Sequence, residues 1–285
     1  MIDKAVEARM VEITSMGRSH VIPLYTSEGP GRGYLPVGSA VLVRRVDGYR
    51  MAVTAGHVMD NVAPLPLFTW GTAETGLVIL DYEGTLTSEP ARPNRKKDPV
   101  DLAAFPLDTE TVRKLEITGA AFLTDIKICH DWDAKGIYVA IGFPHARNKV
   151  KRRVTSEPAD AGNPMASRSQ PRPYVMPNTA VLAPCEASNE ERYREVNADL
   201  ELNFVVNFRH KQVRDTEGKA YPHPRGMSGG AIFRIGRDDT LVRADEIQLA
   251  AIGTEYHEKL GLLIGASAPA VRHLVTALGG GSSSA

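Results

Sequence analysis

The sequence predicts an all-β chain of antiparallel strands followed by one C-terminal helix. Glycine and proline are frequent, with 25 and 19 copies among 285 residues, and such breakers keep the elements between them short. Short runs rich in Val, Ile, Leu and Tyr lie between these breakers, which is typical of strands. Helical periodicity is scarce until the C-terminal segment.

The composition is that of a globular protein, with 42% hydrophobic and 24% charged residues. The 34 basic residues balance the 34 acidic ones, which argues against nucleic acid or an anionic membrane as a partner. No apolar run is long enough to span a membrane, and the N-terminal segment has charges where a secretory signal has an apolar region. Because Cys129 and Cys185 are the only cysteines, we expect free thiols and a cytoplasmic location.

The clearest local signal is a β-hairpin. Residues 39–46 and 49–54 are β-rich runs, and Asp47-Gly48 stands between them. Aspartate and glycine tolerate positive φ angles, so this pair predicts a type I′ turn.

Further strands are expected along the chain, with one helix near its end. Ser267 followed by Pro269 is typical of a helix start and Gly279 of a helix end, which predicts a helix over residues 268–278. One or two helical turns are expected over residues 109–115. The additional strands are expected at residues 76–82, 137–142, 201–207, 230–235, 247–252 and 260–264.

Two stretches of opposite charge bias interrupt this pattern. Residues 145–173 contain seven basic and two acidic residues, whereas residues 186–201 contain six acidic and two basic ones. Both fit long solvated loops, and the alternative is a surface for a substrate or partner. Residues 279–285 have the composition of a flexible linker.

Three segments carry candidate catalytic chemistry. His57 follows small residues at the end of the second hairpin strand, and Asp101 stands at the head of an apolar run. Ser228 lies between glycines and precedes another apolar run. Glycines there let the backbone turn sharply and aim its N–H groups at a developing oxyanion. Each segment alone has an ordinary structural explanation, but a histidine, an aspartate and a serine in this order predict a catalytic group.

The three segments together resemble the motifs of chymotrypsin-like (trypsin-like) serine peptidases, whose catalytic residues follow this chain order. The matching motifs are Thr54-Ala-Gly-His57, Asp101-Leu-Ala103 and Gly226-Met-Ser228-Gly-Gly230. The resemblance covers residues 35–278 and implies two six-stranded antiparallel β-barrels packed together, with a C-terminal helix. It divides the chain into an N-terminal extension (1–35), an N-terminal barrel (36–118), a C-terminal barrel with long loops and the helix (119–278), and the tail (279–285).

The resemblance also implies a role for each motif residue. Ser228 would be the nucleophile. Its hydroxyl would react only when an adjacent base takes its proton. His57 would be that base, and Asp101 would orient its ring and stabilise its charged form. Asp98 is the rival aspartate, and it is disfavoured because it precedes a proline whereas Asp101 opens the apolar strand. The other seven histidines lack the small-residue strand that precedes His57.

The resemblance extends to the substrate. The N–H groups of Gly226 and Ser228 would form the oxyanion hole, and Ile252, Gly253 and Thr254 would contact the substrate. No His/Cys cluster has metal-ligand spacing, so neither a metal nor another cofactor is expected.

Two positions depart from the pattern of many secreted members. Met227 stands where an acid usually pairs with a new N-terminus after zymogen cleavage, so we expect no such activation switch. Pro222 stands where an acid selects Arg or Lys side chains, so trypsin-type selection is disfavoured.

The sequence therefore predicts an intracellular, bacterial serine endopeptidase that acts on protein or peptide substrates under control of a regulatory protein partner. The alternative is a catalytically silent, peptidase-like module that binds proteins. The intact set of His57, Asp101 and Ser228 favours the enzyme.

Overall fold

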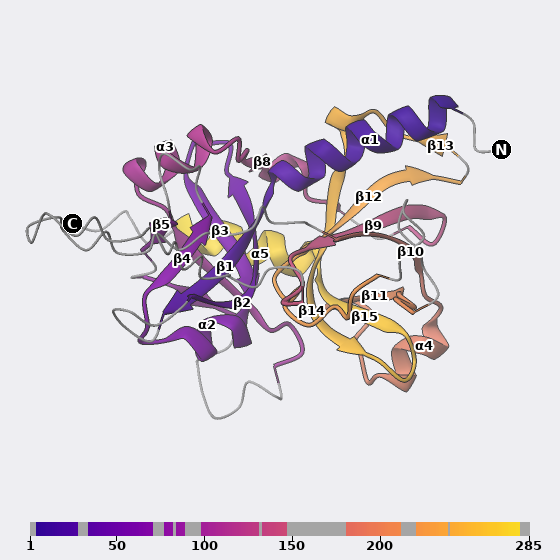
Figure 1. The fold of residues 1–285 in the computed structure, drawn as a ribbon. Coiled ribbons are helices and arrows are strands. Elements are labelled where there is room, and N and C mark those ends of the chain that lie inside the picture. Colours follow the sequence, from indigo (N-terminus) through magenta and orange to yellow (C-terminus); the bar gives the residue numbers. More distant parts are fainter. Residues whose placement is uncertain are drawn as a thin grey trace, which may run out of the picture.

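Two β-sheets lie side by side and carry most of the described chain (Figure 1). The structure is a computed structural model, and it describes residues 4–27, 34–70, 77–81, 84–88, 98–130, 133–146, 181–211, 221–238 and 240–279. The predicted basic stretch at residues 145–173 lies outside these ranges except for its first two residues.

The N-terminal sheet has the strand order β5-β4-β1-β2-β3-β7-β6, and β8 pairs in parallel with β2. The elements of this half are α1 (Lys4–Ser19), β1 (Val21–Ser27), β2 (Tyr34–Arg44), β3 (Arg50–Ala55), α2 (Gly56–Val62), β4 (Leu67–Trp70), β5 (Leu77–Leu80), β6 (Leu86–Thr87), β7 (Leu102–Pro106), α3 (Thr109–Ile117), β8 (Leu123–Thr124) and the 3₁₀ turn η2 (Asp125–Lys127).

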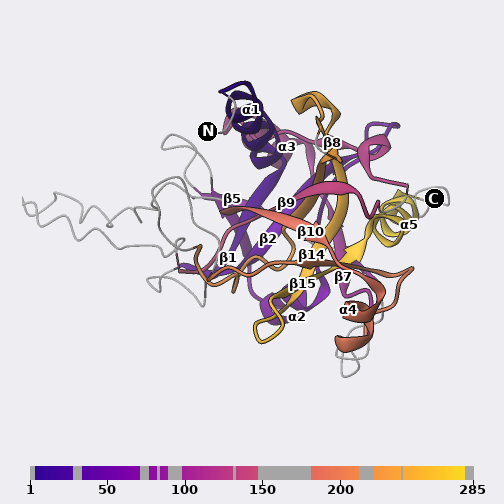
Figure 2. The same cartoon turned by 90° about the vertical axis from the view of Figure 1, so that its right-hand side faces the viewer.

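The C-terminal sheet has the order β13-β12-β14-β15-β11-β10-β9, and a further pairing of β12 with β9 closes six of its strands into a barrel. Figure 2 shows the same elements from the side. The elements of this half are β9 (Gly136–Gly142), β10 (Val181–Ala187), α4 (Glu190–Glu195), β11 (Asn203–Asn207), β12 (Ala231–Arg237), β13 (Thr240–Leu241), η3 (Ala244–Glu246), β14 (Gln248–His257), β15 (Leu262–Ser267) and α5 (Ala268–Gly279).

The expectation of two closed six-stranded barrels is corrected at the N-terminal sheet. Within the described residues its strands form an open path from β5 to β6, with no pairing that joins the two ends. The end strands are short, and β6 has only two residues, so they offer few backbone groups for a closing pair.

Residues 1–35, expected as an extension ahead of the barrel, contribute a helix and a central strand. Strand β1 pairs with β2 on one side and β4 on the other, and its seven residues are all buried. Helix α1 lies over the C-terminal half (Figure 1), where Gly17 packs close to Ile141 and Phe233. The sequence pattern missed both elements because Pro23 interrupts the strand run and the apolar residues of α1 are few.

The predicted hairpin is confirmed, but its turn differs. Strands β2 and β3 pair in register from Val41 with Val53 to Arg44 with Arg50. Positive φ is found at Gly48 (89°) and not at Asp47, so the turn is not type I′. The N–H of Gly48 donates to the carbonyl of Arg45 at 2.9 Å, and Asp47 instead accepts from the N–H of Tyr49 at 3.1 Å. The hydrogen bond that the Asp47 carboxylate makes within the turn therefore favours a connection longer than the two-residue type I′ turn.

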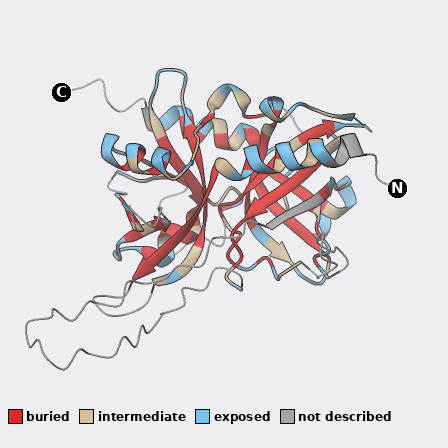
Figure 3. Cartoon of the chain, turned by 45° about the horizontal axis from the view of Figure 1, so that its top comes forward, coloured by how far each residue is buried: buried red, intermediate tan, exposed pale blue. Residues whose placement is uncertain are grey.

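Strands β2 and β3 are buried on both faces, which explains their nearly continuous apolar run. Leu42 and Ala52 point into the N-terminal sheet's own core, whereas Val41, Val43 and Val53 belong to the cluster shared with the C-terminal barrel. Figure 3 shows buried residues along the strands of both halves and exposed ones on one face of α1. This shared cluster places the ends of β3 and β7 next to the barrel.

The remaining expectations concern membranes and cysteines. No helix in the described ranges has the length and apolar character needed to cross a bilayer. Cys129 and Cys185 are buried and form no disulfide, and burial raises the pKa of the Cys185 thiol to about 12.

Candidate active site

A cavity of about 1000 Å³ brings the sequence-predicted residues together. It lies where the end of β3 and the start of β7 face the loop before β12 and the end of β14. Residues from both sheets therefore line one cavity. They are His57, Asp98, Pro99, Asp101, Val196, Asn197, Ala198, Asn203, His223, Pro224, Arg225, Gly226, Ser228, Thr254, Glu255, Tyr256 and Ile264.

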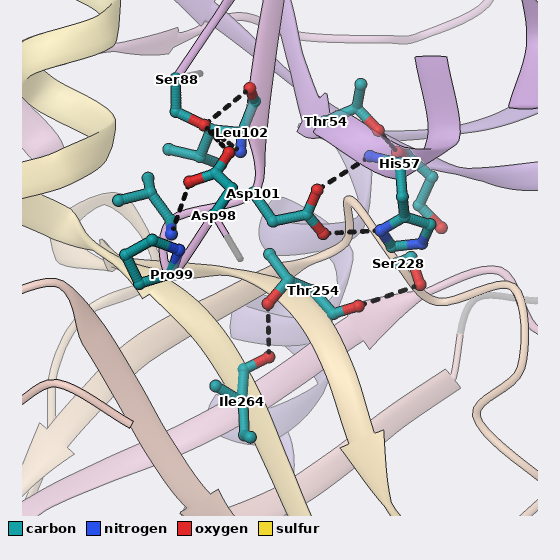
Figure 4. A network of polar contacts seen from close by, with 12 residues as sticks. Thr54, His57, Ser88, Asp98, Pro99, Asp101, Leu102, Ser228, Thr254 and Ile264 are labelled. Carbon is teal, nitrogen blue, oxygen red and sulfur yellow. Dashed lines mark hydrogen bonds and ion pairs between the residues drawn. The ribbon is translucent and has the colours of Figure 1, made fainter. Parts of the chain in front are cut away.

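His57 and Asp101 form a two-point contact. The Asp101 Oδ2 atom lies 2.6 Å from His57 Nδ1, and Oδ1 accepts the backbone N–H of His57 at 2.9 Å (Figure 4). A carboxylate only accepts hydrogen bonds, so a neutral His57 carries its proton on Nδ1. Its Nε2 atom is then left with a lone pair and can act as a base.

The backbone around Asp101 is fixed from both sides. Its carbonyl accepts the N–H of Gly56 at 2.8 Å, and its φ angle is 49°, which is uncommon for a residue other than glycine. Asp98, the rival aspartate, is buried and accepts from the Ser88 hydroxyl at 2.6 Å and from the N–H of Val100 at 3.0 Å. Asp98 therefore supports the loop that presents Asp101, and it is Asp101 that contacts His57.

The turn that carries Ser228 needs two of its glycines. Gly226 has φ 95°, and a Cβ atom there would lie 2.0 Å from the His145 ring. Gly229 has φ 84°, and a Cβ atom there would lie 1.9 Å from the Ser39 carbonyl oxygen. Both positions combine a left-handed backbone with no room for a side chain, so only glycine fits.

Backbone hydrogen bonds hold this turn against two other segments, around Gly253 and Ser39. The N–H of Gly229 donates to the carbonyl of Gly253 at 2.7 Å, and the N–H of Gly253 donates to that of Gly230 at 2.8 Å. The carbonyl of Ser228 accepts the N–H of Ser39 at 2.8 Å. The serine is thus presented by main-chain contacts that do not depend on side-chain charge.

Met227, directly before Ser228, packs into the core. Its side chain is 4% exposed and belongs to the main apolar cluster. A Cβ atom on Gly142 would lie 3.0 Å from Met227 Cβ, so that glycine leaves room for the methionine. Apolar packing therefore stabilises this side of the turn.

The N–H groups of Gly226 and Ser228 have no hydrogen-bond acceptor in the described part of the chain. The carbonyl of Arg225 accepts the N–H of His145 at 2.8 Å. In a trans peptide the C=O and N–H groups point in opposite directions, so this bond turns the Gly226 N–H away from His145. Burial, followed by the charge of Arg225, lowers the pKa of His145.

The Ser228 hydroxyl donates to the carbonyl of Thr254 at 3.4 Å (Figure 4). The figure also shows Ser228 and His57 facing the same space. Catalytic hydrogen bonds are often long or redirected when no substrate is bound, and rotation about χ1 redirects a serine hydroxyl.

Of the three expected substrate-contacting residues, Thr254 lines the cavity. Ile252 is fully buried in the core, and both backbone groups of Gly253 are engaged by the serine turn. Glu255 and Tyr256, the next two residues of β14, line the cavity instead. The sequence signal for these two was their place in the strand directly after Thr254.

The acidic stretch at residues 186–201 also differs from a simple solvated loop. It contains the end of β10 and helix α4, where Tyr193 is buried against Val205, Leu262 and Ile264. Val196, Asn197 and Ala198, which follow this helix, line the cavity. Part of this stretch therefore belongs to the cavity lining.

Among the described residues, no group of three or more His, Cys, Asp or Glu side chains is placed to hold a metal ion. Among the lining residues, Ser228 supplies a hydroxyl, His57 an imidazole and Asp101 a carboxylate.

No protein-family model and no curated protein matches the chain. Solved structures similar to it include the thermostable serine protease AL20 from an extremophilic microorganism, at 14% sequence identity and a TM-score of 0.49, covering 92% of this chain and 98% of that one. Rv3671c from M. tuberculosis H37Rv, in an inactive mutant form, has 10% identity and a TM-score of 0.49 with coverage of 99% and 97%. The protease Anisep from Arthrobacter nicotinovorans has 12% identity and a TM-score of 0.49 with coverage of 92% and 96%.

Proposed function

We propose that this protein is a serine endopeptidase of the chymotrypsin-like type, with Ser228, His57 and Asp101 as its catalytic triad. The observation that carries the proposal is the two-point contact of Asp101 with His57 in the cavity that Ser228 also lines. An aspartate held to Nδ1 leaves Nε2 free to take the serine proton.

The reaction then proceeds through an acyl-enzyme. Ser228 Oγ bonds to the scissile carbonyl carbon while its proton passes to His57 Nε2. The Gly226 and Ser228 N–H groups donate to the resulting oxyanion. The carbon–nitrogen bond breaks as His57 returns the proton to the leaving amine. Water repeats the sequence with His57 again as base, which releases the acid product and restores the serine hydroxyl.

The sharpest test is covalent labelling with a fluorophosphonate probe, which reacts with an activated serine. The wild type is expected to be labelled once and to hydrolyse an unfolded protein, whereas Ser228→Ala loses both activities almost completely. Ser19→Ala is the matched control, because the hydroxyl of this half-buried serine donates to the Met16 carbonyl and Ser19 does not line the cavity. A wild type that neither reacts with the probe nor cleaves, even after a cellular extract is added, would contradict the proposal.

The second candidate is a peptidase-like module that binds proteins without cleaving them. The bond from the Ser228 hydroxyl to the Thr254 carbonyl favours it, because a hydroxyl held there is not engaged by His57. Under this candidate the probe fails, yet peptides still bind in the cavity.

The proposal of a serine endopeptidase also includes control by a protein partner inside the cell. Addition of a cellular extract to an unreactive preparation tests that part.

Activity is further proposed to need no N-terminal cleavage. A buried ammonium group without a partner costs several kcal/mol, and Met227 offers it no charge. An unrelated domain fused ahead of Met1 should therefore leave probe labelling at Ser228 unchanged. Labelling that appears only after the fusion is cut away would contradict this part of the proposal.

A further inference from the structure

A cluster of two histidines and a tyrosine forms one wall of the cavity beside Ser228. The rings of His223 and Tyr256 lie 5.6 Å apart, edge to face, and His210 lies 5.3 Å from His223. His210 is 6% exposed, and its Nδ1 lies 2.7 Å from the Tyr256 hydroxyl oxygen. His223 and Tyr256 both line the cavity, and His210 supports them from behind.

This wall lies where the side chain next to the scissile bond must go. The Thr254 carbonyl accepts from the Ser228 hydroxyl, and the register of β14 shifts at this residue. Thr254, Glu255 and Tyr256 all line the cavity, so Tyr256 lies two residues beyond the carbonyl that contacts the nucleophile. The residue whose carbonyl is attacked, P1, carries its side chain one bond from that carbonyl. A P1 side chain therefore reaches the His223–Tyr256 wall.

Hydrogen bonds determine which atoms the wall presents. His223 Nδ1 accepts the backbone N–H of Arg225 at 3.1 Å, so a neutral His223 ring carries its proton on Nε2 as a donor. Burial, followed by the nearby His223 and Lys211, lowers the pKa of His210, so this ring is neutral at neutral pH. The wall thus presents a histidine N–H donor that a second, buried histidine and a tyrosine hold in place.

The acidic groups near this wall are already paired. Glu258 Oε2 lies 3.6 Å from His223 Nε2, while Oε1 accepts from Lys211 at 2.8 Å, and the hydrogen bond from Lys211 lowers the pKa of Glu258. Glu255 lies 3.1 Å from His257. Arg225 adds a positive charge to the cavity lining. A lysine or arginine side chain at P1 would therefore face the positive charge of Arg225, and the paired carboxylates would not offset this repulsion.

We propose that the His223–Tyr256–His210 wall selects substrates whose P1 side chain ends in a carbonyl or carboxylate oxygen, glutamine or glutamate. The inference rests on the proposed peptidase function. Such an oxygen accepts from His223 Nε2, which lies 3.6 Å from Glu258 Oε2, beyond ordinary hydrogen-bond distance. An apolar side chain offers this donor no closer acceptor.

The test uses a set of fluorogenic peptides that differ only at P1, with Gln, Glu, Leu or Lys. The wild type is expected to cleave the Gln and Glu peptides with kcat/KM at least tenfold above the Leu and Lys peptides. A higher value for Glu than for Gln would assign part of the selection to charge, and equal values would assign it to the shared oxygen. A preference for Leu or Lys would overturn the proposal.

Three variants separate the wall from the nucleophile. His223→Leu and Tyr256→Phe should lose most of the tenfold preference, and His223→Gln, which keeps an N–H donor, should recover part of it. His273→Ala is the matched control, since this exposed histidine of α5 does not line the cavity. A preference retained in His223→Leu would overturn the proposal.

Two readouts distinguish a failure of this inference from a failure of the proposed function. Fluorophosphonate labelling of Ser228 reports on the nucleophile without a P1 side chain. A labelled wild type that shows no P1 preference would therefore overturn this inference and leave the proposed function standing. Fluorescence anisotropy of Ser228→Ala with peptides ending in Gln, Glu or Leu reports on the wall without turnover. Tighter binding of the Gln and Glu peptides supports the wall even if labelling fails, and equal binding of all three overturns it.

Discussion

The two halves of the molecule hold their parts of the site in different ways. The open N-terminal sheet presents His57 and Asp101 through side-chain hydrogen bonds, and these join residues whose backbones already lie next to each other at the ends of β3 and β7. The closed C-terminal barrel presents Ser228 through backbone bonds in a glycine-rich turn.

This difference predicts what a substitution in each half does to activity and to the fold. A side-chain contact can be removed while the backbone stays in place, so activity should fall without loss of the fold. A turn that depends on glycines has no such tolerance, because an added Cβ atom meets backbone atoms directly.

The largest effect is expected at Asp101. In Asp101→Asn the amide no longer fixes the His57 tautomer or stabilises its charged form, and kcat should fall about 10⁴-fold, as the same change does in a known triad. Asp98→Asn is the matched control, and it should lower kcat by no more than about tenfold, because Asp98 contacts Ser88 and Val100 instead. Steady-state kinetics and thermal unfolding of both variants check this. Equal losses in the two variants would contradict the assignment of Asp101.

The next effect is expected at Gly229, where function and stability should fall together. In Gly229→Ala the left-handed backbone and the 1.9 Å approach to the Ser39 carbonyl should cost about 3–5 kcal/mol of unfolding free energy and remove probe labelling.

Gly48→Ala is the control for Gly229. Gly48 also has positive φ, but nothing lies within 4 Å of a Cβ atom there, so we expect a loss of about 1 kcal/mol and unchanged labelling. Denaturant unfolding of the two variants measures the difference. A Gly229→Ala protein as stable as Gly48→Ala would show that the serine turn can relax.

The smallest effect concerns acid, and it compares one buried histidine from each half. Burial lowers the pKa of both His20 and His210. The unfolded chain then binds more protons than the folded one at low pH, so their contribution to stability is present above about pH 6.5 and is lost as the pH falls through the lower folded values.

The midpoint of thermal unfolding should therefore fall between pH 7.5 and pH 5. His20→Gln and His210→Gln should each reduce this fall, while His273→Gln, an exposed change on α5, should not. An unchanged acid response in both buried variants would show that these histidines titrate alike in the folded and unfolded chain.

Much of the fold follows from local patterns. The apolar runs behind β9, β12, β14 and β15 and the start and end signals of α5 predict these elements, because neighbours within a few residues decide strand and helix preference. The motifs around His57, Asp101 and Ser228 likewise consist of short segments whose small residues and glycines show a need for tight turns. A resemblance to known peptidases could therefore be found from these residues alone.

Other features depend on contacts between distant residues. His57 selects Asp101 over Asp98 because the register of β3 and β7 aligns Ala55 with Leu102, directly after Asp101. The N-terminal strand β1 is stabilised by pairing with β2 and β4, which outweighs the proline in its sequence.

The same holds for the wall of His210, His223 and Tyr256, since three separate segments meet there. The residue types present were determined by the sequence itself, and only the tertiary structure decided which of them share the cavity. The physical reason is that strand pairing and core packing, rather than local preference, set the distances between residues far apart in the chain.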